Sequence, residues 1–101
     1  MIEIKPLDTQ SGTVLGIQIG NPEAPDKPAI IVLIAKKGLV VCGNFDINEL
    51  DKRSITAARV IGLTKIEDAL EAKIESCTSR ARALGISEGM TGRDALTKLQ
   101  K

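Results

Sequence analysis

The longest apolar run of the chain, AIIVLIA at 29–35, constrains the fold more than any other stretch. It is rich in β-branched residues, which favour strands, and it is far shorter than the roughly 20 residues that a membrane-spanning helix requires. An uninterrupted apolar run is typical of a strand covered on both faces, so we expect it at the centre of a sheet. A tight turn at 36–38 leads into a second apolar segment at 39–43, which predicts an antiparallel hairpin.

Two more strands are expected before this run. Residues 2–5 alternate weakly and predict a short edge strand, and residues 13–19 alternate strongly enough for a half-buried strand. The two faces of the second strand carry Leu15, Ile17 and Ile19 on one side and Val14, Gly16 and Gln18 on the other. We interpret the glycine-bearing face as a flat solvent face, the alternative being a close approach of another backbone or a ligand. Between the strands, 21–28 holds three of the four prolines and predicts a loop.

The middle of the chain predicts a strand–helix–strand crossover. Asp46 has the character of a helix N-cap, with Glu49 three residues later, so a short helix should follow and end near Arg53. Residues 57–61 then predict another strand, which Gly62 terminates. The two strands of such a unit are parallel, in contrast to the hairpin before it.

The segment 64–84 allows two interpretations. Thr64 and Glu67 have the spacing of a capping box, and apolar positions continue at helical spacing without proline or glycine, which predicts one long helix. Alternatively, 73–77 forms a short strand and Thr78 caps a new helix. After Gly85, Thr91 is expected to cap a last amphipathic helix.

The whole pattern predicts an α+β fold: one compact domain over 1–101, a mixed sheet with N-terminal antiparallel strands, one crossover and C-terminal helices.

Composition excludes several classes of function. The net charge is +1 with 14 basic and 13 acidic residues interspersed, and Phe45 is the one aromatic residue, so we expect no nucleic-acid binding. The first residues resemble no signal peptide and no run could span a membrane, so we expect a cytosolic protein without membrane contact. With no histidine and two cysteines, familiar catalytic sets and a four-ligand zinc site are missing. We therefore expect no metal and no cofactor.

Three strings stand out together: GLVVCGNFDIN at 38–48, GLTKIEDAL at 62–70 and LGISEGMTGRDALTKL at 84–99. Their order and spacing resemble the YunC-like family, small bacterial and archaeal proteins classed as a domain of unknown function. The resemblance implies a single α+β domain that self-associates and has no assigned activity. It also implies a strand-like 73–78 segment, which favours the broken interpretation of 64–84.

The most promising site follows the second strand of the hairpin. In α/β units, ligands often sit beyond the carboxyl ends of strands, and two strands of the predicted parallel pair end near Cys42 and Gly62. The candidate ligand-binding residues are Cys42, Gly43, Asn44, Asp46, Gly62 and Thr64. A catalytic interpretation makes Cys42 a nucleophile tuned by Asp46 or by the helix N-terminus, but a cysteine after three aliphatic residues more often packs as a small hydrophobe.

A second candidate site lies at the start of the last helix. Thr91, Gly92 and Arg93 offer a hydroxyl, backbone amides and a guanidinium, which are the components of an anion site. They match no nucleotide-binding spacing, and capping alone explains the threonine and glycine.

These observations favour a small ligand-binding or protein-interaction module that acts as a homo-oligomer, with a small molecule or a protein as its partner. Two alternatives stay open. One is a cysteine-dependent enzyme or redox protein that uses Cys42, and the other is a structural subunit of a larger complex. Whether the protein is an enzyme is left undecided by the sequence, with the balance against it.

Overall fold

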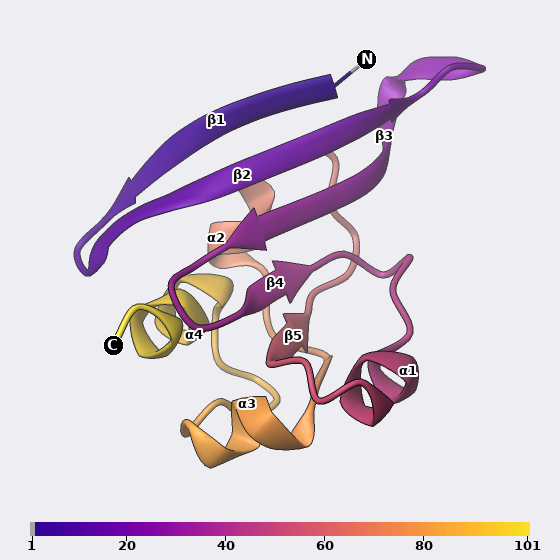
Figure 1. The fold of residues 1–101 in the computed structure, drawn as a ribbon. Coiled ribbons are helices and arrows are strands. Elements are labelled where there is room, and N and C mark those ends of the chain that lie inside the picture. Colours follow the sequence, from indigo (N-terminus) through magenta and orange to yellow (C-terminus); the bar gives the residue numbers. More distant parts are fainter. Residues whose placement is uncertain (1) are drawn as a thin grey trace.

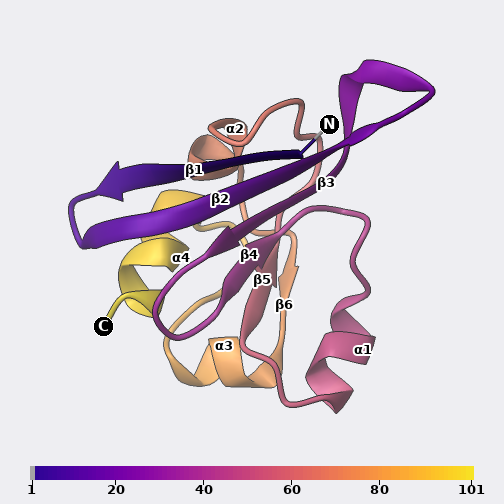
Figure 2. The same ribbon diagram turned by 45° about the horizontal axis from the view of Figure 1, so that its top comes forward.

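A mixed β-sheet organises the chain, with its strands in sequence order from one edge to the other (Figures 1 and 2). The computed structural model describes residues 2–101, apart from the side chains of residues 25 and 26. Within that range the sheet has six strands: β1 (Ile2–Thr9), β2 (Gly12–Asn21), β3 (Ala24–Ile34), β4 (Leu39–Val41), β5 (Ala57–Arg59) and β6 (Ser76–Cys77). The β4–β5 pair is parallel and the other neighbours are antiparallel. The α+β prediction is confirmed.

The helices are α1 (Ile47–Lys52), α2 (Asp68–Glu71), α3 (Ser79–Ala83) and α4 (Gly92–Leu99). The predicted crossover is present, because α1 connects the parallel strands β4 and β5. The carboxylate of Asp46 accepts hydrogen bonds from the amides of Asn48 and Glu49, and α1 ends at Arg53 as expected. Across the described residues, no helix is long and apolar enough to cross a membrane.

The segment 64–84 is broken, as the second interpretation predicted. It contains α2, then β6, then α3, whose N-cap is Thr78. The predicted capping box at Thr64 has a different partner: the Thr64 hydroxyl donates to Asp68 at 2.7 Å, while Glu67 forms an ion pair with Lys5. The segment does not form one long helix, although its apolar residues recur at helical spacing, because Ser76 and Cys77 pair with β5 as a strand.

The first three strands form a long antiparallel arm. The expected loop at 21–28 was wrong, since β2 continues to Asn21 and β3 starts at Ala24, with a two-residue turn between them. The pairing register shifts on either side of Gly20, which lies opposite Pro28. Proline lacks an amide hydrogen, and an irregular part of a ladder is where a strand tolerates it. The expected edge strand at 2–5 is likewise longer, reaching Thr9.

The hydrophobic core lies on one face of the sheet, beneath α2 and α4. Val14 and Leu33 from the arm and Val40 from β4 are at most 1% exposed, and they share this core with Leu96 and other side chains of the helices. The solvent-face interpretation of the glycine side of β2 was therefore wrong. A Cβ atom on Gly16 would lie 2.6 Å from Cγ2 of Ile66, so the missing side chain makes room for that isoleucine.

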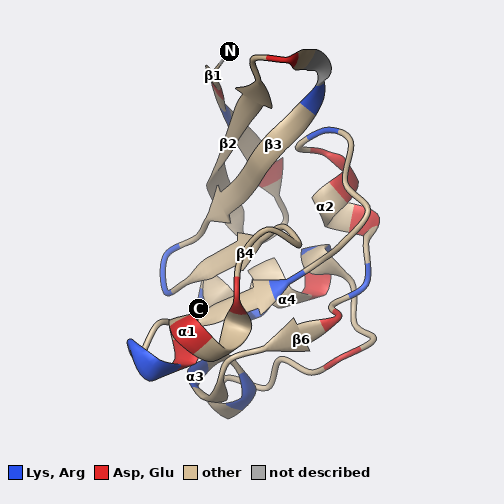
Figure 3. Ribbon diagram, turned by 90° about the vertical axis from the view of Figure 1, so that its right-hand side faces the viewer, with Lys and Arg blue, Asp and Glu red and all other residues tan. Residues whose placement is uncertain are grey.

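The opposite face of the arm is open. Figure 3 shows α2 and α4 on one side of the arm and α1 lower down, and none of the described helices covers the other side of β1–β3. Helix α1 contacts β5 instead. The run at 29–35 is thus covered on one face only, which corrects the prediction of a strand buried on both. Ile31 and Leu33 face the core, whereas Ile34 is 37% exposed.

Candidate functional site

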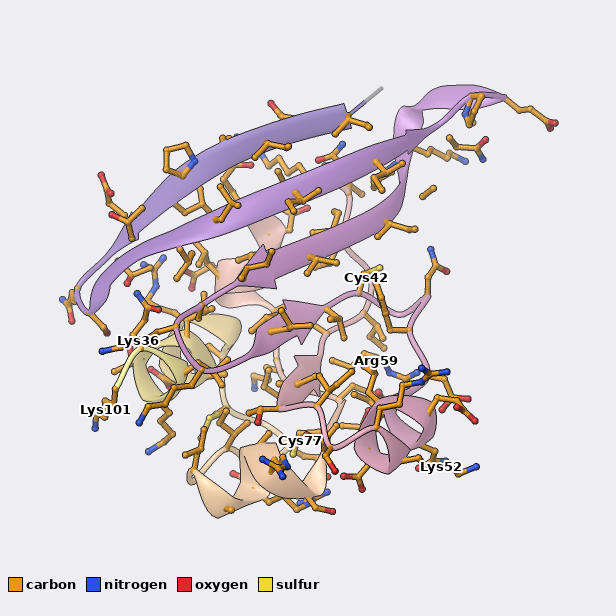
Figure 4. The ribbon with its side chains drawn as sticks, in the orientation of Figure 1. Lys36, Cys42, Lys52, Arg59, Cys77 and Lys101 are labelled. Atoms are coloured by element: carbon orange, nitrogen blue, oxygen red, sulfur yellow. The ribbon has the colours of Figure 1, made fainter. Side chains whose placement is uncertain are left out.

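Cys42 directly follows β4 and forms hydrogen bonds with the neighbouring strand β3. The backbone amide of Cys42 donates to the carbonyl of Ile31 at 3.1 Å, and the amide of Ile31 donates to the Cys42 Sγ at 3.4 Å. Cys42 is 8% exposed and belongs to the hydrophobic core. The backbone pairing of β3 and β4 therefore continues one residue past the end of β4 and places the thiol against the neighbouring strand (Figure 4).

A notch of about 200 Å³ opens where these strands end. Three separate segments line it: Pro28, Ala29, Ile30 and Ile31 of β3; Cys42, Gly43 and Asn44 after β4; and Gly62 and Leu63 after β5. The side-chain amide of Asn44 donates to the carbonyl of Ala29 across the notch. Gly62 has a φ of +77°, and among the described residues no atom beyond its two chain neighbours lies within 4 Å of the point that a Cβ would occupy. Backbone conformation, not crowding, therefore calls for glycine there.

Four of the six predicted ligand-binding residues meet at this notch: Cys42, Gly43, Asn44 and Gly62. The other two lie outside its lining. The Asp46 carboxylate caps α1, and the Thr64 hydroxyl bonds to Asp68. Sequence reasoning missed the β3 residues and Leu63. The hairpin register, which pairs Val32 with Val41, was the signal that could have placed 28–31 beside 42–44.

The surroundings of Cys42 are apolar and carry no general base. Of the hydrogen bonds formed by the described residues, none joins its sulfur to an ionisable side chain. Asp46, the proposed tuning group, uses one carboxylate oxygen to accept two amides of α1. The geometry is that of a packed thiol in the wall of the notch.

Arg59 braces the segment after the notch and was not singled out from the sequence. Its Nε donates to Glu75 Oε1 at 2.8 Å and its Nη1 donates to the Phe45 carbonyl at 2.7 Å. The hydrogen bond from Arg59 is the main cause that lowers the pKa of Glu75, and that from Ser76 adds to it. Figure 4 shows the arginine reaching toward the segment between β4 and α1. A charged residue within the apolar AARVI string was the available signal.

The predicted anion-binding residues have partners within the chain. Thr91 caps α4 through the amide of Asp94, and the Gly92 amide donates to the Ala72 carbonyl at 2.8 Å. The Arg93 guanidinium donates to Glu71 at 2.6 Å. A Cβ on Gly92 would lie 1.8 Å from the Ala69 carbonyl oxygen, so this glycine serves the close packing of α4 on α2.

A more open depression of about 610 Å³ lies between α1 and α3. At its side, Asp51 accepts hydrogen bonds from the amide and the hydroxyl of Ser79, both at 2.9 Å. These bonds lower the pKa of the Asp51 carboxyl. The arrangement joins two helices that are far apart in sequence and is fully explained by that contact.

The second cysteine is also a core residue. Cys77 Sγ donates to the carbonyl of Ile86 at 3.7 Å, and burial raises the pKa of its thiol. Among the described side chains, no group of three or more His, Cys, Asp or Glu residues could hold a metal ion.

Comparison with known proteins assigns a family. Residues 41–99 match the family model described as a domain of unknown function, DUF1805. Over the full length of both chains, the protein is 30% identical to the uncharacterized protein YunC of Bacillus subtilis (strain 168). The fold is similar to the crystal structure of a protein of unknown function, TA1206, from Thermoplasma acidophilum, with a TM-score of 0.85 and 25% identity over 98% of this chain and 93% of the other. The chain belongs to the DUF1805 family, and the YunC-like resemblance is confirmed.

Proposed function

We propose that this member of the DUF1805 family is a small cytosolic binding module that acts as a homo-oligomer and holds a small uncharged molecule in the notch beside Cys42. The observation that carries the proposal is the convergence of three chain segments, 28–31, 42–44 and 62–63, on one hollow. Crossover strands bring their carboxyl ends to the same edge of a sheet, which is where α/β units most often bind ligands.

The lining determines the class of ligand. It contains aliphatic side chains and backbone, the thiol of Cys42 and the amide of Asn44, with no charged side chain among the residues that form it. Backbone groups and Asn44 can offer hydrogen bonds, but no lining side chain could pair with an ion, so a neutral ligand with hydrogen-bonding groups fits best. The volume of about 200 Å³ is below the usual range of roughly 300–1,000 Å³ for drug-sized ligands, which favours a metabolite fragment of small size.

Binding is favoured over catalysis by the state of Cys42. Its side chain is 8% exposed and accepts an amide hydrogen bond, whereas a nucleophilic thiol needs a neighbouring base or cation and access to its substrate. The homo-oligomer part of the proposal is supported by the open aliphatic face of the arm, where Ile4 is 60% exposed.

Titration followed by amide chemical shifts tests the notch. A panel of small neutral amides and alcohols should shift the amide resonances of 28–31, 42–44 and 62–63. Asn44→Ala should weaken binding at least fivefold, because it removes the polar group that crosses the notch. Asn48→Ala is the matched control, since Asn48 is also an exposed asparagine and lies on α1 outside this lining.

Two outcomes would contradict the binding proposal. One is the absence of localised shifts for the whole panel at millimolar concentration. The other is rapid alkylation of Cys42 in the folded protein, with a rate that follows a titration well below the free thiol pKa of about 8.5, which would favour the enzyme alternative.

A further inference from the structure

The uncovered face of the arm is aliphatic over three strands. Cross-strand partners share a face, so the register defines a set that we call the open face: Ile2, Ile4 and Pro6 of β1; Leu15, Ile17 and Ile19 of β2; and Ile30, Val32 and Ile34 of β3. Ile2 and Ile4 are 65% and 60% exposed, and Leu15 in the central strand of the arm is 40% exposed. These nine described residues include no charged side chain.

We propose that a second copy of this chain covers the open face, so that two sheets pack face to face in a symmetric, reversible homodimer. This inference rests on the homo-oligomer part of the proposed function and assigns its surface. A flat aliphatic sheet is complementary to another such sheet, with side chains interdigitating at a spacing of about 10 Å. Without charges of its own, the open face does not repel its copy, and a twofold interface uses the same patch on both subunits.

The composition of β3 supports a second covering layer. A run such as AIIVLIA is characteristic of strands buried on both faces, yet within one chain Ile34 is 37% exposed while Leu33 is fully buried. A second sheet over the open face would bury the other side of β3 as well, as its composition predicts. Large contiguous apolar patches on a protein surface commonly mark interaction sites.

Pairing through the sheet edge is less suitable than pairing through the face. The long edge strand of the sheet is β1, which carries Glu3, Lys5 and Pro6, and the other edge strand, β6, has two residues. Charged side chains and proline on an edge strand disfavour addition of another strand, because proline supplies no amide hydrogen and charges oppose a flat stack. The open face carries no charged side chain. Pro6 lies on it, but packing of two faces needs no amide hydrogen, and the proline ring adds apolar surface there.

The size of the open face sets the expected strength of association. The open face covers five residues on each strand, about 17 Å, and three strands are about 14 Å wide, so each copy offers about 240 Å² in plan. Two copies would cover about 480 Å² in plan, which is at the low end of weak and transient interfaces. We therefore expect a monomer–dimer equilibrium that depends on concentration rather than a permanent dimer.

Sedimentation velocity from about 1 to 500 µM tests the proposal. The wild-type chain should move from monomer to dimer over this range. Leu15→Lys should weaken dimerisation at least tenfold, because it places a charge at the centre of the interface. The matched control is Leu84→Lys at the end of α3, a leucine of nearly the same exposure, 37% against 40%, which should leave the equilibrium within twofold of wild type.

A second variant guards against misfolding. If Leu15→Lys lowers the melting temperature strongly, Ile4→Lys on the edge strand, where the side chain is 60% exposed, should weaken the dimer without unfolding it. A strict monomer at 500 µM would overturn the dimer and the homo-oligomer part of the proposed function. It would not affect the proposal that the notch binds a ligand, which the titration tests on its own. A dimer that survives both open-face substitutions would overturn only the surface assigned here.

Discussion

The arm of β1–β3 and the region of β4–β6 use the same sheet in different ways. In the arm, long strands with aliphatic residues on both faces are covered by helices on one side, and Leu15 lies 40% exposed on the other. In the second region the strands are two or three residues long, yet Val41 and Ala57 are fully buried. There α1 contacts β5, and Figures 1 and 2 show α1 and α4 to either side of β4 and β5. Aliphatic content therefore does not determine burial, because coverage depends on where the helices fall.

The largest expected effect contrasts the two faces of the arm. Leu33→Ala should lower the free energy of unfolding by about 2–5 kcal/mol, because it leaves a cavity under the helices. Leu15→Ala should cost about half of that or less when measured at about 1 µM protein. Urea denaturation of both variants gives the comparison. If both substitutions lower the free energy of unfolding equally at this concentration, the two faces of the arm are equally covered, which would contradict an open face.

A smaller effect is expected in the helical layer that covers the core. Gly92→Ala should cost about 3 kcal/mol, since the added Cβ would collide with the Ala69 carbonyl and push α4 away from α2. Gly89→Ala is the control, because its φ of +93° carries conformational strain of about 1–2 kcal/mol but no atom lies within 4 Å. Thermal melts distinguish the two: a loss for Gly92→Ala no larger than that for Gly89→Ala would mean that the added Cβ fits without moving α4 away from α2.

The smallest effect concerns the polar contact that joins α1 to α3. The Asp51 carboxyl has a lowered pKa in the folded protein, so it stabilises the fold above the ordinary pKa of about 3.9 and loses that contribution as the pH falls through the folded value. Asp51→Asn should therefore lower stability at pH 7, with the difference shrinking as the pH falls below the ordinary carboxyl pKa and through the lower folded value. Urea midpoints of the variant and the wild type between pH 2.5 and 7 measure it. A constant difference at every pH would assign the effect to shape rather than charge.

Local patterns predicted the second half of the molecule well. The caps at Asp46 and Thr91 and the αL glycine at 85 were identified because each depends on a few neighbouring residues, whereas the cap at Thr78 was one of two open interpretations. The register shifts around Gly20 depend on pairing with β3, and the loop expected at 21–28 was wrong for that reason. The partner of Thr64 was also missed, since Glu67 turned toward Lys5, 62 residues away.

The candidate site was partly accessible from sequence. Strand ends and glycines pointed to Cys42, Gly43, Asn44 and Gly62, which the fold brings to one notch. The contributions of 28–31 and Leu63 and the brace formed by Arg59 depend on side-by-side packing of distant segments. Such contacts leave no periodic signal in the chain.

The sequence by itself determined most of the element types, the mixed sheet and the family, because alternation, capping and turn chemistry act within a few residues. Only the tertiary structure decided which face of β2 is buried. Alternation shows that the two faces differ, and Leu15, Ile17 and Ile19 have the composition of an inner face. The structure instead buries the face of Gly16, because Ile66 fills the space above that glycine. Burial is a property of what packs on a surface, and that partner lies 50 residues further along the chain.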